Sequence, residues 1–450
     1  MDGASNYSAF LDSFNHFGFS GTIILKNKMI NLKNKKILII GMGITGESIA
    51  NYLENKNITF FVLDNKPTKA LKNKFTNILL DEIISDKLLS KYDVLFISPG
   101  VFIEQNLFKK YQNKIYNDIS LFCQVITKNI IAITGTNGKS TVVKMIEHII
   151  NKMGKKAIAC GNIGLPVLDL LQKKNHYDYY ILEISSFQLD LNSSFNKKIA
   201  VVLNIEKDHL DRYENFTDYK KSKLSIFKES EHKIINSNIK NSNIKESNKF
   251  GTDDEKYNIQ GQKFNINDKI INAKSYNKIE QINQLATLAI LDVLNFDTKV
   301  CNEHFLTFKA LNYRMQFIGS YKNSKWFNDS KATNSSATFA ALESQPEKIV
   351  LIAGGSKKDE DFLSLKSIIK EKCKSLILIG QTAQQIAQVT TGVQLFFAKN
   401  LKEAIIIAQD ECGGYHNVLF SPASASFDMF KNYQQRGYEF NRLSKDILDL

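Results

Sequence analysis

The sequence has few prolines and cysteines and no long apolar run, and each shortage excludes a class of protein. Five cysteines are scattered among 450 residues without a C-x-x-C pair. We therefore expect neither a disulfide framework nor a zinc site. We expect the protein to work in a reducing compartment. No apolar run approaches the ~18 residues that a membrane-spanning helix needs. The start, MDGASNYSAFLDSF, has an early aspartate and no basic region, so we expect no signal peptide, no membrane partner and a cytoplasmic location.

Positive charge is in excess but is not concentrated. The chain has 59 Lys and Arg against 46 Asp and Glu, a net charge of +13. A nucleic-acid-binding surface would gather arginine, lysine and aromatic side chains on one face. Here lysine is spread along the whole chain, so we expect no nucleic-acid partner. A cleft for polyanionic substrates is compatible with this charge.

Apolar strand-like runs alternate with helical patterns in three sets. This alternation predicts an α/β fold of three domains with mainly parallel sheets. From the motifs that these domains carry, we expect the first and third to be Rossmann-like and the middle one to be like a phosphate-loop ATPase. We place the domains at residues 35–117, 118–309 and 310–450. Residues 1–34 form an extension of unknown role. Residues 231–278, rich in Asn, Lys and Ser, are expected to be irregular or edge structure.

The stretch IAITGTNGKST, residues 131–141, predicts a nucleotide-binding loop. The common pattern G-x-x-x-x-G-K-[ST] would begin where Ile133 stands, so the loop here is the shorter G-x-x-G-K-S from Gly135. Its backbone N–H groups would face a phosphate at the start of a helix. Lys139 would supply a positive charge and Ser140 a hydroxyl ligand for magnesium. The alternative is a glycine turn with a chance GKS.

A second glycine turn, GMGITG, follows an earlier strand. Its glycines and Asp64, about 20 residues on, match a dinucleotide-binding fingerprint. A nicotinamide dehydrogenase is the default interpretation of this segment alone. The nucleotide loop argues against it, because one enzyme seldom needs both hydride transfer and phosphoryl transfer.

Polar side chains also follow three later strands. Glu183 ends a strand in LEISSFQL, His209 lies in DHLD, and Asp329 and Lys331 lie in NDSKATN. Ligands of such sheets bind at the carboxyl ends of the strands. DHLD or NDSKATN alone would be read as a solvated turn. Beside a nucleotide loop they predict a metal and phosphate site.

These motifs together resemble the Mur ligases, the ATP-dependent enzymes that build the peptide stem of bacterial peptidoglycan. TGTNGKS looks like that family's own loop. LEISSFQL, DHLDRY, NDSKATN and SPASASFDMFKNYQQRG resemble the member that adds D-glutamate to UDP-N-acetylmuramoyl-L-alanine, over residues 36–448. The resemblance implies these two substrates, ATP and Mg²⁺ as cofactors, and an acyl-phosphate intermediate. We expect a monomer.

The resemblance also implies a role for each matching residue, with UDP, ATP and amino acid bound by the first, second and third domain. Contacts to the UDP substrate are expected from Ile44, Thr45, Asp64, Asn65, Lys66, Ser98, Pro99, Gly100, Asn162 and His209. ATP contacts are expected from Gly135, Thr136, Asn137, Gly138, Lys139, Ser140, Thr141, Asn283, Arg314 and Asp329. D-Glutamate contacts are expected from Thr333, Lys358, Ser426, Phe427 and Tyr433. The implied magnesium ligands are Ser140, Glu183, His209 and Lys223, the last as a carbamate. The implied catalytic residues are Lys139, Glu183, His209, Lys223, Arg314 and Lys331.

The sequence departs from the family pattern around the nucleotide. Tyr313 stands where histidine is usual, Gln316 where glutamate is usual, and Glu280 and Gln281 where His-Asn usually begins a helix. The alternatives are a sister Mur ligase and a folylpolyglutamate synthase-like ligase, which share the loop but lack the SSFQL and SPASAS signatures. A third is a non-catalytic nucleotide-sensing module, which should have lost some of the charged residues that are intact here.

Overall fold

The computed structural model shows an α/β protein, as the sequence predicts. It describes residues 30–64, 68–75, 77–79, 82–173, 175–191, 195–208, 212–240, 244–252, 256–275, 277–356 and 361–449. The expected N-terminal extension therefore lies outside the described residues up to position 29. Among the helices that are described, none is long and apolar enough to cross a bilayer.

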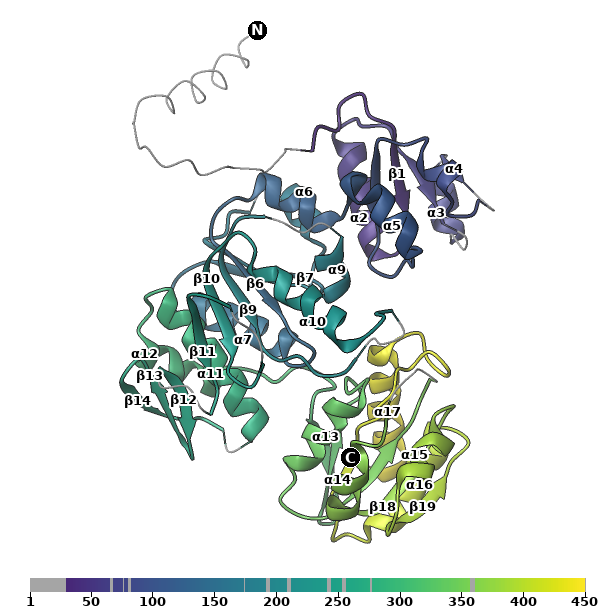
Figure 1. Cartoon of the computed structure of the whole chain (residues 1–450). Helices are drawn as coiled ribbons and strands as arrows, with labels where there is room; N and C mark the ends of the chain where they lie inside the picture. The colour runs from purple at the N-terminus through teal and green to yellow at the C-terminus, as the bar shows by residue number, and fades with distance from the viewer. Residues whose placement is uncertain are drawn as a thin grey trace. The chain divides into compact units, whose positions relative to one another are not determined.

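The first sheet is parallel, with its strands in the order β3-β2-β1-β4-β5. Figure 1 labels β1 in this purple-to-blue part of the chain. The strands are β1 (Ile37–Ile40), β2 (Phe61–Leu63), β3 (Ile78–Leu79), β4 (Val94–Ile97) and β5 (Ile115–Tyr116). The helices around them are α2 (Ile44–Asn55), α3 (Lys69–Lys74), α4 (Asp86–Leu89), α5 (Gln105–Tyr111) and the 3₁₀ turn η1 (Gln112–Lys114). The next helix, α6 (Asp118–Val125), leads to the central sheet, and its Phe122 ring packs against Tyr180 there. The strand order reverses between β1 and β4. The crevice beyond their carboxyl ends is the usual ligand position in such a sheet.

The central sheet is parallel and has the order β11-β10-β9-β6-β8-β7. Its strands are β6 (Ile130–Thr134), β7 (Ala157–Gly161), β8 (Tyr179–Glu183), β9 (Lys197–Val202), β10 (Ser230–Asn236) and β11 (Ser247–Phe250). Its helices are α7 (Lys139–Lys152), α8 (Val167–Gln172), α9 (Ser186–Asp190), α10 (Phe216–Leu224), η2 (Ser225–Phe227), α11 (Lys278–Val293), α12 (Thr298–Glu303) and η3 (His304–Thr307). Strand β6 is buried throughout and pairs with β8 and β9. This pairing places the nucleotide loop between the ends of those two strands.

The expectation of irregular or edge structure at residues 231–278 is correct for β11, which is an edge strand of the central sheet, but wrong where it predicts irregular structure. The segment completes β10, forms β11, and then makes an antiparallel sheet of β12 (Tyr257–Gln260), β13 (Lys263–Ile266) and β14 (Lys269–Asn272). Phe264, Ile266 and Ile271 are buried in the core of the central domain. A few apolar residues at alternating positions therefore suffice to form this sheet despite the polar composition.

The last sheet has the order β15-β16-β20-β17-β18-β19, parallel except for the first pair. Its strands are β15 (Gln316–Tyr321), β16 (Ser324–Asn328), β17 (Ile349–Ala353), β18 (Cys373–Leu378), β19 (Gln394–Phe397) and β20 (Val418–Phe420). Its helices are α13 (Ser335–Glu343), α14 (Leu365–Lys372), α15 (Ala383–Val389), α16 (Leu401–Cys412) and α17 (Tyr433–Leu448). Leu351 packs toward α13 and α14, whereas Val350 and Ile352 pack toward α16 and α17. Helices therefore cover both faces.

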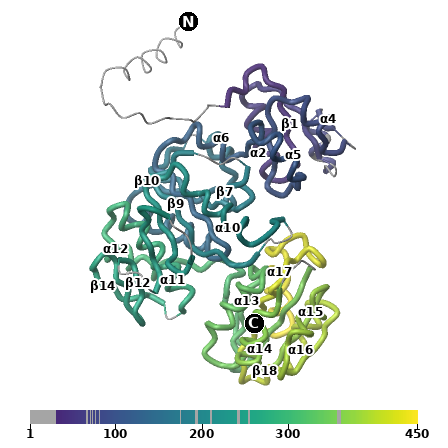
Figure 2. Tube along the Cα trace, viewed as in Figure 1, coloured from purple at the N-terminus to yellow at the C-terminus, as the bar shows by residue number. Residues whose placement is uncertain are grey.

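Each of the three larger sheets is built from one consecutive stretch of chain, as the colours of Figure 2 show. The boundaries that we place near residues 117 and 309 fall between these stretches. They remain predictions, because the folding of each part by itself is a separate question.

Candidate active site

The nucleotide loop joins the end of β6 to the start of α7. Gly138 adopts a left-handed conformation with φ of +80°, and a Cβ added there would lie 2.7 Å from Asn283 Oδ1. Asn204, just after β9, fixes the loop from the other side, because its Oδ1 accepts from Asn137 N at 2.8 Å and its carbonyl oxygen accepts from Thr136 N at 3.1 Å. The loop is thus held open in front of a helix N-terminus, which suits a phosphate.

Two lysines converge on the Gly135 carbonyl oxygen. Lys139 Nζ donates to it at 2.6 Å and to Thr136 O at 2.8 Å, and Lys223 Nζ donates to it at 2.9 Å. Burial lowers the pKa of Lys139. Burial and the neighbouring charge of Lys139 lower the pKa of the Lys223 amine well below its ordinary value. Lys223 is only 2% exposed. An amine in this position favours its neutral form.

Glu183 supplies a carboxylate at the end of β8. Its Oε1 accepts from Asn162 Nδ2 at 3.0 Å, which brings together two residues predicted for the site. Its Oε2 is buried and has no hydrogen-bond partner among the described residues. A buried, unshared carboxylate oxygen is the hard ligand that Mg²⁺ prefers, so the residues present fit a magnesium ion. No cluster of three or more His, Cys, Asp or Glu side chains suits a metal within the described ranges, which leave out the predicted ligand His209.

Residues of the third predicted domain contact the nucleotide loop directly. Arg314 Nη2 donates to Ser140 Oγ at 2.9 Å, so the predicted magnesium hydroxyl lies beside a cation. Asn137 Nδ2 donates to Ser336 Oγ at 2.9 Å. Asn334 Nδ2 donates to Asp208 Oδ2 at 2.9 Å. The last contact joins the NDSKATN and DHLD motifs in space.

Asp329 is buried and Lys331 is partly buried. Asp329 accepts from Ser421 Oγ at 2.9 Å and from Met315 N at 3.2 Å, and burial raises its pKa to about 7. Burial and the charge of Arg314 lower the pKa of Lys331 to about 7. The Lys331 ammonium lies 4.0 Å from the ring centroid of Tyr433, a residue predicted for the amino-acid site. Groups that titrate near neutrality are typical of active sites.

The predicted D-glutamate residues differ in exposure. Ser426 is buried at 3%, whereas Phe427 is 72% exposed. Thr333 is partly buried in the segment that leads to α13. Lys358 lies outside the described residues, as do Asn65 and Lys66 of the predicted UDP site.

The glycine turn after β1 has the close packing that its motif predicts. Gly41 has φ of +86°, and its carbonyl oxygen accepts from Ser98 Oγ at 2.6 Å. Asp64 Oδ2 accepts from Met42 N at 2.6 Å and so fixes the same turn. Ile44 is 79% exposed at the start of α2, and Thr45 is partly buried. Ser98, Pro99 and Gly100 follow β4 beside this turn.

Comparison with known proteins adds a sequence match along nearly the whole chain. Residues 35–118 match the model described as Mur ligase MurD-like, N-terminal domain, and residues 133–321 match the Mur ligase middle domain. The UDP-N-acetylmuramoylalanine--D-glutamate ligase of Buchnera aphidicola subsp. Acyrthosiphon pisum (strain Tuc7) is 37% identical, over 93% of this chain and 99% of the relative. This chain belongs to the Mur ligase family. A ligase of the same name from Pseudoalteromonas translucida (strain TAC 125) is 34% identical to this Mur ligase, over 91% and 97% of the two chains.

Solved Mur ligase structures share the fold at low sequence identity. The UDP-N-acetylmuramate-alanine ligase MurC from Thermotoga maritima superposes with a TM-score of 0.59 at 16% identity, covering 92% of this Mur ligase and 99% of that chain. The MurF ligase from Thermotoga maritima, in complex with ADP, gives a TM-score of 0.60 at 14% identity, covering 94% and 97%. At such identities the likeness concerns the fold alone.

Sequence reasoning missed Arg436, which this Mur ligase buries completely in α17. Its guanidinium donates to the carbonyl oxygens of Ser424 and Ala425, and to both the hydroxyl and the carbonyl oxygen of Ser330. One arginine thus joins the SPASAS and NDSKATN loops. Arg436 lies in the QQRG run at the end of the family signature, which could have marked it as a residue of interest. Nothing in that tetrapeptide indicates that its partners are backbone carbonyls.

Proposed function

We propose that this Mur ligase joins the amine of D-glutamate to the carboxylate of UDP-N-acetylmuramoyl-L-alanine, with ATP converted to ADP and phosphate, in the synthesis of peptidoglycan precursors. Relatives that carry the name of this activity support it, since they match over nine-tenths of the chain. The geometry supports it as well, because Arg314 contacts Ser140 of the loop, and Glu183 lies close enough to Lys139 of the loop and to Lys331 of NDSKATN to influence the pKa of both amines.

The reaction needs activation because a carboxylate is a poor electrophile at neutral pH. Transfer of the γ-phosphoryl group from ATP to a carboxylate oxygen gives an acyl-phosphate and ADP. The D-glutamate amine then attacks the acyl carbon, a C–N bond forms, and inorganic phosphate leaves with the C–O bond electrons. Catalysis of this kind depends on positioning and charge stabilisation, so no nucleophilic side chain is needed.

The cationic side chains of the site supply that stabilisation. Lys139 lies over the nucleotide loop, and Arg314 reaches the same loop at Ser140. Lys331 lies near Tyr433, on the side from which the amino acid is expected to enter. We infer that Lys139 and Arg314 stabilise charge on the transferred phosphoryl group, and that Lys331 stabilises the tetrahedral oxyanion.

Magnesium would be held by Glu183, Ser140, His209 and Lys223 as its carbamate. When bound, it would supply a Lewis acid that neutralises charge on the phosphates. The carbamate is what the family resemblance implies, and the chemistry of the lysine is compatible with it, because a neutral buried amine can capture CO₂ with loss of a proton and the product presents anionic oxygens. The unshared Oε2 atom of Glu183 supports this assignment.

We further propose a division of labour among three domains. Residues 35–117 would bind UDP, 118–309 would bind ATP, and 310–450 would bind D-glutamate, while residues 1–34 have no assigned role. The enzyme would work as a monomer in the cytoplasm. The glycine turn of the first sheet, the phosphate loop of the second and the buried Ser426 of the third support this assignment.

The observation that carries the proposal is the contact of Arg314 with the loop hydroxyl of Ser140, because it brings a cation from the last part of the chain to the loop that we assign to the ATP phosphates. The test is phosphate release from ATP with UDP-N-acetylmuramoyl-L-alanine and a panel of amino acids and folates. We expect release that requires both the nucleotide sugar and D-glutamate. Release with another amino acid alone would indicate a sister ligase, and release with a folate would indicate a folylpolyglutamate synthase-like enzyme. Lys139→Ala should abolish the signal.

A further inference from the structure

Arg212 lies next to the DHLD motif and contacts the first sheet's loops from the central part of the chain. Its Nη1 donates to the Pro99 carbonyl oxygen at 3.0 Å, and its Nη2 donates to the Val101 carbonyl oxygen at 2.9 Å. The planar fork of a guanidinium suits two acceptors side by side, and lysine has no equivalent. Arg212 therefore fixes both the position and the direction of the segment that it holds.

The flat face of the same guanidinium lies on an aromatic ring of the central domain. Arg212 Cζ is 4.0 Å from the ring centroid of Phe187 in α9. The Phe187 ring stacks on Tyr213, with centroids 6.1 Å apart and an interplanar angle of 13°. The Tyr213 hydroxyl donates to Asp190 Oδ2 at 2.6 Å. The arginine is thus oriented by a chain of contacts on one side while its N–H groups bind carbonyls on the other.

The carbonyls belong to a turn that is part of the predicted UDP site. Val101 N donates to Ser98 O at 3.0 Å, which closes residues 98–101 into a turn. Ser98 Oγ donates in addition to Gly41 O, and a Cβ added at Gly41 would lie 2.5 Å from Val101 Cγ2. The turn and the glycine turn after β1 therefore form one packed unit. Whatever holds residues 98–101 also places the glycine turn.

Side-chain packing supports this turn only in part. A cavity of about 580 Å³ lies beside it, lined in part by Pro99, Val101, Phe187 and Arg212. Open space next to these residues means that van der Waals contacts are missing there. The hydrogen bonds of Arg212 supply a restraint that packing does not.

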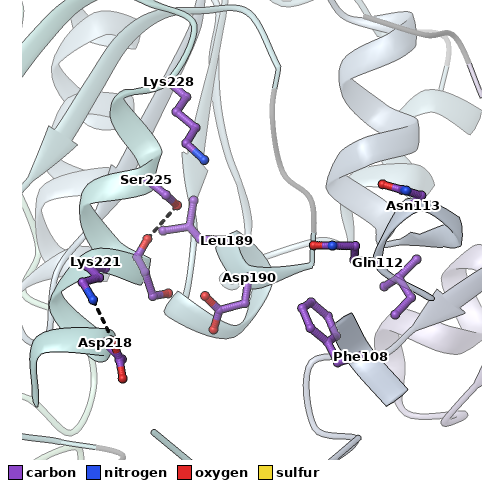
Figure 3. A pocket seen from close by; sticks show the side chains of 11 residues that line it. Phe108, Gln112, Asn113, Leu189, Asp190, Asp218, Lys221, Ser225 and Lys228 are labelled. Carbon is purple, nitrogen blue, oxygen red and sulfur yellow. Dashed lines mark hydrogen bonds and ion pairs between the residues drawn. The ribbon is translucent and has the colours of Figure 1, made fainter. Parts of the chain in front are cut away.

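A second cavity, of about 420 Å³, adjoins the first and shares Phe108, Asp190 and Asp218 with it. Figure 3 shows Phe108 and Gln112 extending from one wall of this cavity and Asp190 and Lys221 from the other. The two cavities together thus separate α5 of the first part from the central helices α9 and α10. Because few side chains touch across this space, the polar contacts that do cross it are the main restraint on the turn.

We propose that Arg212 is a positioning residue for the UDP end of the nucleotide sugar. It holds the turn at 98–101, and through it the glycine turn, in a fixed relation to the central domain, and it touches none of the reacting atoms. The inference rests on the proposed function, because the turn is assigned to the UDP substrate through the family resemblance.

The experiment compares Arg212→Lys with wild type in steady-state kinetics for all three substrates. Loss of a two-pronged charge-assisted contact should raise KM for UDP-N-acetylmuramoyl-L-alanine by roughly tenfold or more. We expect KM for ATP and D-glutamate and the kcat to stay within about twofold, because chemistry follows once the nucleotide sugar is bound. Arg442→Lys is the matched control, since Arg442 pairs only with Glu439 and Asp446 on α17 in the described structure, and it should change no constant.

A second variant and a rescue keep the inference testable if Arg212→Lys folds poorly. Phe187→Leu removes the ring under the guanidinium and should raise the same KM to a smaller extent. Arg212→Ala should recover affinity for the nucleotide sugar when guanidinium ions are added, and not when ammonium ions are added. An unchanged KM in every variant would overturn the role of Arg212, and so would a rise of all three KM values together with a lower melting temperature.

The failure of this inference is distinguishable from that of the proposed function. A wild-type enzyme that does not turn over D-glutamate with the nucleotide sugar would refute the function. Calorimetric binding of UDP to wild type and to Arg212→Lys would still decide the inference, since it needs no turnover. Equal affinities would refute it, and weaker binding by the variant would support it.

Discussion

Lys223 is the most unusual side chain of the active site, because a lysine is buried there with a neighbouring lysine on the same acceptor. Both amines donate to Gly135 O, and the ring of Tyr219 lies 4.8 Å from the Lys223 nitrogen. Two ammonium groups that donate to the same carbonyl oxygen repel each other in a poorly solvated site. In the proposed site, a neutral amine, and then an anionic carbamate that holds magnesium, would remove that repulsion.

We predict that Lys223→Ala loses activity by roughly a hundredfold or more, since it removes the proposed carbamate ligand of the magnesium ion that neutralises charge on the phosphates. Small carboxylates such as acetate should restore part of the activity by occupying the vacated space. ¹³C-bicarbonate should give a carbamate signal with the wild type and none with the variant. Lys221→Ala, on the exposed side of the same helix, is the matched control and should stay active. A fully active Lys223→Ala enzyme would remove this residue from the metal site.

The two groups with pKa values near 7 predict how stability depends on pH. Asp329 has a folded pKa of about 7 against an ordinary value of 3.8, so the folded state binds more protons and stability falls as pH rises from about 4 to about 7. Lys331 has a folded pKa of about 7 against 10.5, so stability rises again from pH ~7 to ~10.

Urea unfolding of the ligand-free protein across this pH range measures the effect. The free energy of unfolding of Asp329→Asn minus that of wild type should increase by roughly 2–4 kcal/mol as the pH rises from 4 to 7. Above pH 7 this difference should stay constant. Lys331→Met should exceed wild type in stability most below pH 7, and the difference should shrink between pH 7 and 10. A difference that does not vary with pH would show that the two groups titrate normally.

Among the helices and strands, the apolar parallel strands were the predictable part. The strands Ile37–Ile40 and Ile130–Thr134, in the runs KKILII and NIIAIT, are buried throughout and require no tertiary information to recognise. The β12–β14 sheet was missed because its composition is polar. The signal was present in its turns: Gly261 has φ of +61°, and Asn267 and Asp268 have φ of +50° and +68°, as a tight hairpin requires.

The nucleotide loop was predictable from its spelling, whereas the contacts around it were not. Gly138 and Lys139 occupy the places that a phosphate loop demands. Arg212 and Arg436 bind backbone carbonyls of distant loops. Since every residue has a backbone carbonyl, the residue types do not indicate which carbonyls will be bound. The same holds for the contact of Asn334 with Asp208. Long-range polar contacts of this kind depend on the fold as a whole.

Gly138→Ala tests the loop geometry against a matched glycine. Alanine at Gly138 suffers the strain of a positive φ, about 1–2 kcal/mol, and its Cβ would meet Asn283 Oδ1 at 2.7 Å. Gly154, at the other end of α7, has φ of +79° and nothing within 4 Å of an added Cβ. We expect both variants to be similarly destabilised, while only Gly138→Ala raises KM for ATP, by roughly tenfold. Equal KM values for the two variants would contradict the assignment of this loop to ATP.

The molecule as a whole joins its three larger sheets through polar contacts between loops and helices. Ser48 Oγ donates to Asp169 Oδ1 at 2.6 Å between α2 and α8, and Arg314 and Asn334 connect the last sheet to the central one. Contacts of this kind can break and re-form during a catalytic cycle. In the proposed arrangement, in which each of three substrates binds on its own sheet, the substrates must be brought within reacting distance, about 3–3.5 Å between amine and acyl carbon.

The most direct test of the proposed activity is a competition between the two enantiomers of glutamate in one reaction. Isotope-labelled D-glutamate and unlabelled L-glutamate are supplied in equal amounts with ATP and UDP-N-acetylmuramoyl-L-alanine, and the product is identified by mass spectrometry. We predict a product heavier by one labelled glutamyl residue, with one phosphate released for each molecule formed. A product that carries the unlabelled residue to an equal or greater extent would contradict the account.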